Sequence, residues 1–313
     1  MASVPAEITT TQRVAGVTLA AFGGILFAVQ GRVNGQLGHV LHDGVFAALV
    51  STGIGLVLLV IAVAVRQAAR KGGARLVAGL RAGRLRWWQC LGGACGAYVI
   101  AAQGITVTTL GVAVFTVALV SGMVASGLVV DRAGIGPGGP RPVTARRAMA
   151  AALAVVAVLV AVSNKFGNPA DLWLAVLPAT AGIGIAWQTA VNGLVRRESG
   201  DVVMATMVNF LTAIAALIAA CAVDLALRGW PAAAPGQWWL YVGGLLGAGG
   251  VLTAVFAVRL IGVLVLSLAS VAGQLIGAVG LDIVVPTAGG LSAVSVIGAT
   301  ITMVAVAVAA VRR

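Results

Sequence analysis

Two pairs of amide side chains stand at matching places in the two halves of the chain. Gln30 and Asn34 are four residues apart in one apolar run, and Gln188 and Asn192 repeat that spacing in another. On a helix, this spacing puts both amides of a pair on one face. Because amides donate and accept hydrogen bonds, each pair predicts either contacts with a polar substrate or hydrogen bonds between packed membrane helices.

Other polar side chains also lie within apolar runs, where a polar group is costly unless it is paired or faces water. Gln103 and Gln274 occupy non-equivalent positions in the two halves. We expect them either to supply asymmetric contacts to a substrate or to be structural. Trp187, next to Gln188, is expected either to stack on a planar substrate or to anchor at the membrane interface, which is commoner for tryptophan.

The charged residues near these amides predict boundary roles. Arg32 lies on a different helix face from Gln30 and Asn34, and we expect it to extend to the outer lipid headgroups. Turned inward instead, it would favour an anionic substrate. Asp131 and Asp282 end equivalent apolar runs, where capping or boundary roles are expected and ion coupling is the alternative. No acid lies in the middle of a run, which argues against proton-coupled export of cationic drugs.

The elements that carry these residues must be membrane helices. With 60% hydrophobic and 9% charged residues, the chain is too apolar for a soluble domain. A span takes about 20 apolar residues. The runs predict ten transmembrane helices, near 14–34, 45–65, 87–107, 111–130, 147–163, 172–192, 203–223, 238–258, 262–282 and 291–311. Asp43 and Asp201 precede equivalent helices and are expected to cap them.

The basic residues predict the orientation of these helices. The net charge of +12 lies mostly in loops, and seventeen of the twenty Lys and Arg residues fall on the side that holds both termini. Arg32, Lys165 and Arg228 lie on the other side. Cytoplasmic loops carry the excess of basic residues, so both termini are expected in the cytoplasm. Anionic lipid headgroups explain the charge, and no nucleic-acid partner is expected.

The two halves also align as an internal repeat. A second block of matches, offset by 151 residues, pairs Trp87-Trp88 with Trp238-Trp239, Gly92-Gly93 with Gly243-Gly244, and Gly96 with Gly247. Five helices per copy is an odd number, which forces the second copy to enter the membrane from the opposite side. We therefore expect two inverted five-helix repeats, residues 1–163 and 164–313, forming one membrane domain. The glycine pairs are expected to pack helices closely.

These motifs resemble a known family. Q-x-x-x-N-G in the first helix, W-W-x-x-x-G-G-x-x-G-A in the third, and Gly-rich fourth helices ending in Asp are similar to the YdcZ branch of the drug/metabolite transporter (DMT) superfamily, in a fused ten-helix form. The resemblance runs from about Val14 to the C-terminus. It implies a DMT/EamA-like transporter fold, a ten-helix basket around a central cavity in a bacterial inner membrane, and it supplies no substrate.

The sequence therefore predicts a secondary transporter that exports a small polar or amphipathic metabolite by alternating access. The alternative is a non-transporting assembly or sensor-partner protein in which the amides clamp helices; lipid scrambling would need a lateral polar groove. Cys90, Cys95 and Cys221 show no metal-ligand spacing, and no nucleotide-binding loop or nucleophile elbow occurs, so no metal, cofactor or enzyme activity is expected. The fifth and tenth helices are expected to face lipid or to form a homodimer seam.

Overall fold

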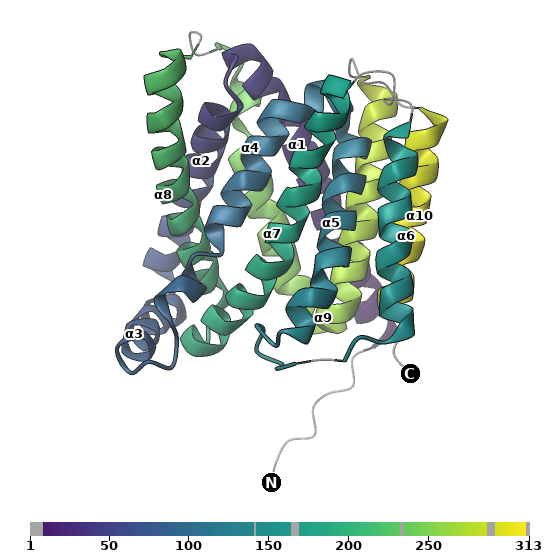
Figure 1. The fold of residues 1–313 in the computed structure, drawn as a ribbon. Helices are drawn as coiled ribbons and strands as arrows, with labels where there is room; N and C mark the ends of the chain where they lie inside the picture. Colours follow the sequence, from purple (N-terminus) through teal and green to yellow (C-terminus); the bar gives the residue numbers. More distant parts are fainter. Residues whose placement is uncertain (1–8, 141, 164–168, 232–234, 287–291, 311–313) are drawn as a thin grey trace.

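The computed structural model describes residues 9–140, 142–163, 169–231, 235–286 and 292–310, and within these ranges the chain is all helical, as expected (Figure 1). The α-helices are α1 (Thr10–Leu41), α2 (Gly44–Val65), α3 (Gln67–Arg81), α4 (Gly93–Leu110), α5 (Val112–Arg132), α6 (Ala145–Ala161), α7 (Pro169–Ser199), α8 (Val202–Arg228), α9 (Gly243–Val284) and α10 (Ala293–Ala310). Short 3-10 turns, η1 (Trp87–Cys90) and η3 (Trp238–Tyr241), precede α4 and α9.

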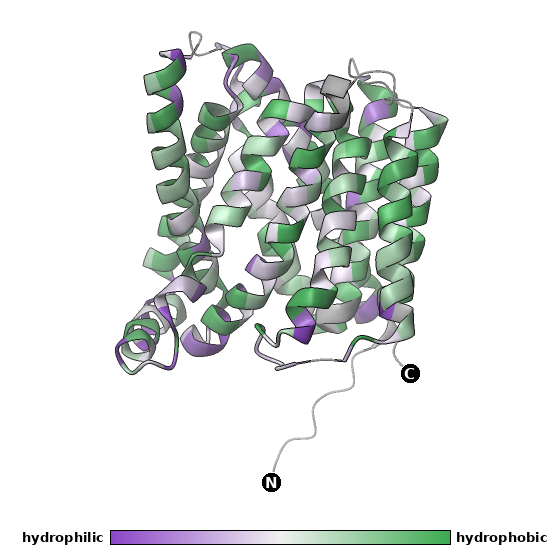
Figure 2. Cartoon of the chain, viewed as in Figure 1, coloured by the Kyte–Doolittle hydropathy of each residue, from purple (hydrophilic) through white to green (hydrophobic). Residues whose placement is uncertain are grey.

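The helices form one bundle with two distinct ends. We call the end where α1 begins and α10 ends the lower end, and the end that holds the α1–α2 turn at His42 the upper end (Figure 1). Hydrophilic residues gather at the lower end, above all on α3, whereas the middle of the bundle is mostly hydrophobic (Figure 2). This banding is what a chain surrounded by lipid requires.

Several helical stretches are long and apolar enough to cross a membrane. Within the described residues there are seven: Thr10–Leu41, Gly44–Val65, Trp87–Leu110, Val112–Arg132, Trp173–Ser199, Val202–Arg228 and Val265–Val284. Shorter apolar helical stretches cover Arg147–Ala161, Gly243–Ala254 and Ala293–Val308. The chain is therefore an integral membrane protein by length and composition of its helices.

Helix α9 departs from the sequence prediction of separate helices at 238–258 and 262–282. Its hydrogen bonding continues over 42 residues, because Gly262 stays helical, whereas its counterpart Gly111 adopts φ 84° and separates α4 from α5. Nevertheless α9 doubles back on α1. Gly250 lies against Phe27, Ile261 lies against Gly16 near the lower end, and Gly273 returns to Ala21. Figure 1 shows α9 descending to the lower end and rising again.

Helix α3 lies between the helices predicted at 45–65 and 87–107, in a basic segment for which no helix was predicted. It is amphipathic: Ala69, Gly72, Leu76 and Gly79 are buried at helical spacing, and its basic side chains point outward. Its buried face packs on the turn between α7 and α8, where Gly72 approaches Ser199 and Asp201. Two ion pairs, Arg66–Asp201 at 3.5 Å and Arg84–Glu198 at 2.8 Å, hold the same contact.

The expected caps of α2 and α8 are confirmed. The Asp43 carboxylate accepts hydrogen bonds from the backbone N–H groups of Val45 at 2.9 Å and Phe46 at 2.8 Å. The Asp201 carboxylate accepts one from Met204 N–H at 2.9 Å. Each carboxylate satisfies donors that the first helical turn leaves unpaired.

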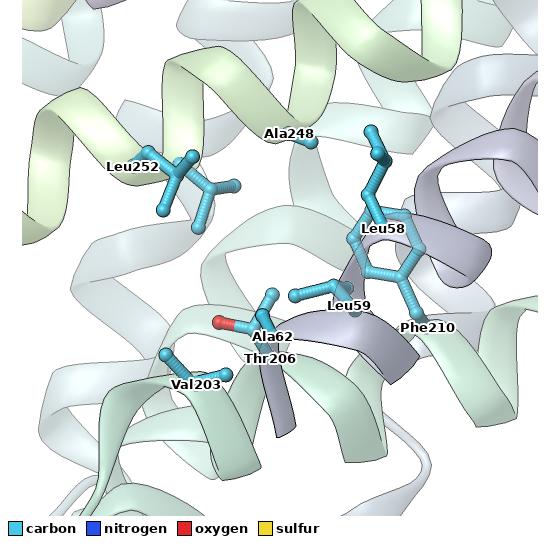
Figure 3. Close-up of a pocket in the computed structure, with 9 residues that line it drawn as sticks. Leu58, Leu59, Ala62, Val203, Thr206, Phe210, Ala248 and Leu252 are labelled. Atoms are coloured by element: carbon cyan, nitrogen blue, oxygen red, sulfur yellow. The ribbon is translucent and has the colours of Figure 1, made fainter. Parts of the chain in front are cut away.

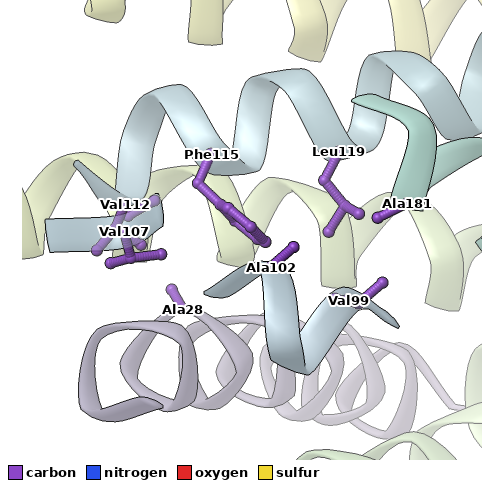
Figure 4. Close-up of a cluster of buried hydrophobic side chains, with 9 residues drawn as sticks. Ala28, Val99, Ala102, Val107, Val112, Phe115, Leu119 and Ala181 are labelled. Atoms are coloured by element: carbon purple, nitrogen blue, oxygen red, sulfur yellow. The ribbon is translucent and has the colours of Figure 1, made fainter. Parts of the chain in front are cut away.

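The upper half of the bundle is densely packed around α5. Every residue from Val112 to Ser121 is buried, and none from Gly122 to Arg132 is. Phe115, 1% exposed, packs in a cluster to which α1, α4, α7 and α9 also contribute side chains, among them Ala28 and Ala102 (Figure 4). The bundle is therefore closed around α5 in its upper half and looser in its lower half.

Candidate functional site

The first amide pair lies in the closed upper half. Gln30 is 8% exposed and Asn34 is fully buried, both on α1. The Asn34 Nδ2 donates a hydrogen bond to the Oε1 of Gln103, on α4, at 2.8 Å. Gln103, 5% exposed, thus joins the first pair in one buried amide group. Hydrogen bonds of this kind join packed helices in a medium that offers no water.

The second amide pair, on α7, lies in the lower half. Gln188 and Asn192 are half-buried. The Asn192 Nδ2 donates a hydrogen bond to the Oδ1 of Asn209, on α8, at 3.1 Å. Asn209 was not predicted as a site residue, although it is a polar residue inside an apolar run and its repeat counterpart is Ser51, also polar. Comparing the two copies for polar residues at equivalent positions would have found both.

Each amide pair packs against the paired glycines of the other half of the chain. A Cβ on Gly243 would sit 2.3 Å from the Asn34 Oδ1, and one on Gly247 would sit 2.6 Å from the Gln30 Nε2. Equivalent contacts occur in the lower half: a Cβ on Gly92 would lie 2.8 Å from the Asn192 Oδ1, and one on Gly96 would lie 3.3 Å from the Gln188 Oε1. A side chain at any of these glycines would displace an amide.

Buried polar atoms without a hydrogen-bond partner cluster at these contacts. Within the described residues they include the Asn34 Oδ1, the Ser51 Oγ and the Gln188 Oε1. The first two lie 2.3 and 2.9 Å from the same point, where a Cβ on Gly243 would sit. Unsatisfied buried polar groups are costly in apolar surroundings, so these atoms can offer acceptors to a bound polar molecule.

Trp187 and Gln274 lie apart from the hydrogen-bonded amides. The Trp187 ring stacks on that of Trp88, in η1, with centroids 6.5 Å apart and an angle of 21° between the ring planes. Gln274 is half-buried in the second half of α9, where the backbone crosses Gly24 of α1. Its side chain makes no hydrogen bond with any described residue.

Asp131 and Asp282 are repeat-equivalent in sequence and differ in surroundings. Asp131, at the lower end of α5, forms an ion pair with Arg147. Asp282 is 2% exposed, and its two carboxylate oxygens accept hydrogen bonds from the N–H groups of Val112 at 3.0 Å and Ala113 at 2.7 Å. It caps α5, whose own N-cap residue, Gly111, has no side chain.

The prediction that Arg32 extends to the headgroups is wrong. Arg32 is only 8% exposed. The prediction placed the end of the first helix at Asn34, whereas α1 continues to Leu41. Arg32 therefore lies within the helix, covered by its neighbours, and its side chain stays in the upper half of the bundle.

Several pockets adjoin the helices that carry these residues, and one of about 270 Å³ lies at the upper end, where His39, His42 and Asp43 contribute to its lining. A pocket of about 380 Å³ with a mostly apolar lining opens at the lower end, between Met123, Gly127 and Asp131 of α5, Thr189 of α7 and the loop at Gly136–Gly139. A smaller one of about 50 Å³ lies between α2, α8 and α9 (Figure 3). It is lined by apolar side chains and the single hydroxyl of Thr206, so it suits hydrocarbon and not a polar molecule.

The fold defines a helical integral membrane protein. A family model described as "Putative inner membrane exporter, YdcZ" matches residues 15–160 and 173–309. The chain therefore belongs to the YdcZ family of the DMT superfamily, which confirms the resemblance seen in its motifs and makes it a member of a family of exporters, not of enzymes. None of the curated proteins matches the chain.

Proposed function

We propose that the chain is a secondary transporter that exports a small polar or amphipathic metabolite across the inner membrane by alternating access. Ten transmembrane helices form two inverted repeats, residues 1–163 and 164–313. The lower end, with both termini, faces the cytoplasm. The amides Gln30, Asn34, Gln103, Gln188 and Asn192 bind the cargo as the two ends open in turn, and Gln274 and Trp187 lie beside its path.

The number of spans is supported by the path of α9. Because α9 descends and returns, it supplies two spans, Gly243–Ala254 and Val265–Val284. Counted with the other long and short apolar stretches of the described residues, they make ten. The two regions that match the family model, 15–160 and 173–309, fall on either side of the proposed repeat boundary. The orientation is supported by the basic residues of α3 at the lower end, where anionic headgroups and the cytoplasm favour them.

One observation carries the proposal: each amide pair meets glycines of the other half of the chain, and these two amide contacts differ in closeness at the two ends. The amide oxygen of Asn34 lies 2.3 Å from the Cβ position of Gly243, and that of Asn192 lies 2.8 Å from that of Gly92. The nearest atom of Gln30, its Nε2, lies 2.6 Å from the Cβ position of Gly247. The nearest atom of Gln188, its Oε1, lies 3.3 Å from the Cβ position of Gly96. Both amide contacts are wider at the lower end, whereas the neighbouring backbone contact is closer there, with Gly93 against Asn209 at the lower end and Gly244 against Ser51 at the upper end.

Wider amide contacts at the lower end agree with a transporter open to that end. The pocket along α5 at the lower end and the buried upper half of α5 agree with the same state, and the pocket of about 270 Å³ at the upper end lies beside α1, α2 and α4, away from α5. In an inverted repeat, exchanging the geometries of the two contacts closes the lower end and opens the upper one. The paired glycines allow this exchange, since they present no side chain that would block sliding of the backbones.

The rival function, a non-transporting membrane protein, is favoured by the hydrogen bonds of Asn34 with Gln103 and of Asn192 with Asn209, which join helices of the same half. Under this alternative both contacts are permanent clamps, and the upper half never opens. The two functions therefore differ in whether a residue in the upper half of α5 is ever reached from outside.

A reversible cross-link tests this difference. A Cβ on Gly184, in α7, would sit 3.1 Å from the Sγ of Cys95, in α4, so Gly184→Cys places two thiols where a disulfide can lock the lower contact. Thr116→Cys, at a position 1% exposed in the upper half of α5, is the reporter. Cys90 and Cys221 are replaced by Ala, and a membrane-impermeant maleimide is added outside right-side-out vesicles.

Alternating access predicts slow labelling of the reporter under reducing conditions and at least a tenfold lower rate after oxidation. The matched control carries Gly184→Cys with Cys95→Ala, cannot form the disulfide, and should label equally under both conditions. If the reporter stays unlabelled in every variant, the upper half does not open, and the clamp function takes the place of transport.

A further inference from the structure

The buried side chain of Arg32 has no hydrogen-bond or ion-pair partner within the described part of the chain. It is 8% exposed, its Nε is fully buried without a hydrogen bond, and the guanidinium forms neither a hydrogen bond nor an ion pair with any described residue. A buried charge without a partner is strongly unfavourable, and such a residue within a membrane span commonly marks the path or site of an ion or substrate.

Asp282 does not neutralise this charge. It interacts with Arg32 electrostatically, but the two side chains form no ion pair. Both oxygens of the Asp282 carboxylate are taken by the N–H groups of Val112 and Ala113, at the positive end of the α5 dipole. One carboxylate thus faces two positive groups, the α5 terminus and Arg32, and the balance around Arg32 stays positive.

The other acids with described side chains are engaged elsewhere. Asp43 caps α2, Asp131 pairs with Arg147, and Asp201, Glu198 and Asp224 pair with Arg66, Arg84 and Arg228. No described carboxylate thus forms an ion pair with Arg32. A guanidinium presents a planar fork of donors that matches carboxylate or phosphate oxygens in pairs, which is why arginine is used to bind these groups.

We propose that Arg32 forms an anion-binding site in the upper half of the bundle, between α1, the N-terminus of α5 and the second half of α9, and that it takes the carboxylate or phosphate group of a small molecule. The repeat counterpart of Arg32 is Ala190, so the site occurs in one copy alone. It lies on the face of α1 that turns away from Gln30 and Asn34. The inference rests on the proposed function in one respect: if the chain is a transporter, a site at Arg32 makes its cargo an anion.

Binding is measured on purified protein in nanodiscs of zwitterionic lipid, by thermal unfolding and equilibrium dialysis, with succinate and inorganic phosphate as probes. Succinamide, which matches succinate in shape but has no charge, is the ligand control, and Arg228→Gln, at an exposed arginine of the upper end, is the protein control. We expect saturable binding of at least one anionic probe and none of succinamide. Arg32→Gln should weaken binding at least tenfold, Arg32→Lys about threefold, and Arg228→Gln not at all.

Stability without a ligand separates this site from a structural role. If the Arg32 site is unoccupied in the ligand-free protein, Arg32→Gln removes a buried charge that has no ion-pair partner, and the apparent melting temperature should stay the same or rise. A fall that Asp282→Asn reverses would make Arg32 the counter-charge of Asp282 and overturn the proposal. Equal binding by wild type and Arg32→Gln would also overturn it, as would no binding of either probe.

Lipid composition identifies the source of the anion. In nanodiscs that contain phosphatidylglycerol, a site for soluble anions should bind succinate or phosphate with unchanged affinity. Loss of binding in those nanodiscs would mean that a lipid phosphate occupies Arg32, and would overturn the assignment to a small molecule. The cysteine-labelling experiment contains no anionic probe, so the failure of one proposal leaves the other standing.

Discussion

Removing the Asp282 carboxylate should destabilise the protein much more than removing its repeat counterpart, Asp131. Asp282 is 2% exposed and accepts hydrogen bonds from Val112 and Ala113, which are each 1% exposed, so water cannot replace it. A buried donor left unsatisfied costs about 1–3 kcal/mol. Two such donors, less the cost of burying the carboxylate that is removed, predict a loss of about 2–4 kcal/mol for Asp282→Ala.

Asp131→Ala is the matched control. Its carboxylate is 36% exposed and pairs with Arg147, so its loss should cost about 0–1 kcal/mol. Asp282→Asn keeps one acceptor for α5 and should fall between the two variants. The free energy of unfolding is measured by equilibrium titration with sodium dodecyl sulfate in mixed micelles. Equal losses in Asp282→Ala and Asp131→Ala would refute the assignment of Asp282 as the cap of α5.

Two further predictions follow from glycine packing and from α3. Gly243→Ala should lower the free energy of unfolding by about 1–3 kcal/mol, because its Cβ would meet the Asn34 Oδ1 at 2.3 Å, whereas Gly280→Ala, with no atom within 4 Å of the new Cβ, should be neutral or stabilising by up to about 1 kcal/mol. A similar loss in both variants would contradict the close packing. Arg84→Ala should cost less than about 1 kcal/mol and should have less effect at high salt, since its ion pair with Glu198 at 2.8 Å is exposed; a larger, salt-independent loss would show that the residue acts through packing.

The class of the protein and its family could be predicted from the sequence because they depend on local features. Runs of apolar residues make membrane helices wherever they are about 20 residues long. The caps by Asp43 and Asp201 act over two or three residues and were predicted correctly. The motifs that resemble the YdcZ branch are short and contiguous, and the family model confirms them.

Helix ends and surface helices were harder to predict from local features. The first helix was predicted to end at residue 34, but α1 runs to Leu41, and this error placed Arg32 at the membrane boundary. The spacing of small and apolar residues in α3 is helical, but its mean hydropathy is low, so a search for apolar runs passed over it. Its helix is supported by packing on the α7–α8 turn.

The sequence by itself determined that helices cross the membrane and that polar amides recur at equivalent places in two copies, since composition and spacing along one chain are enough for both. Only the tertiary structure decided which groups meet. Asp282 caps a helix 170 residues away, and Gln103 joins Asn34 across 69 residues. Such contacts depend on which helices pack side by side, and packing in lipid is set by the fit of small residues over whole helix faces, which spacing along one helix does not encode.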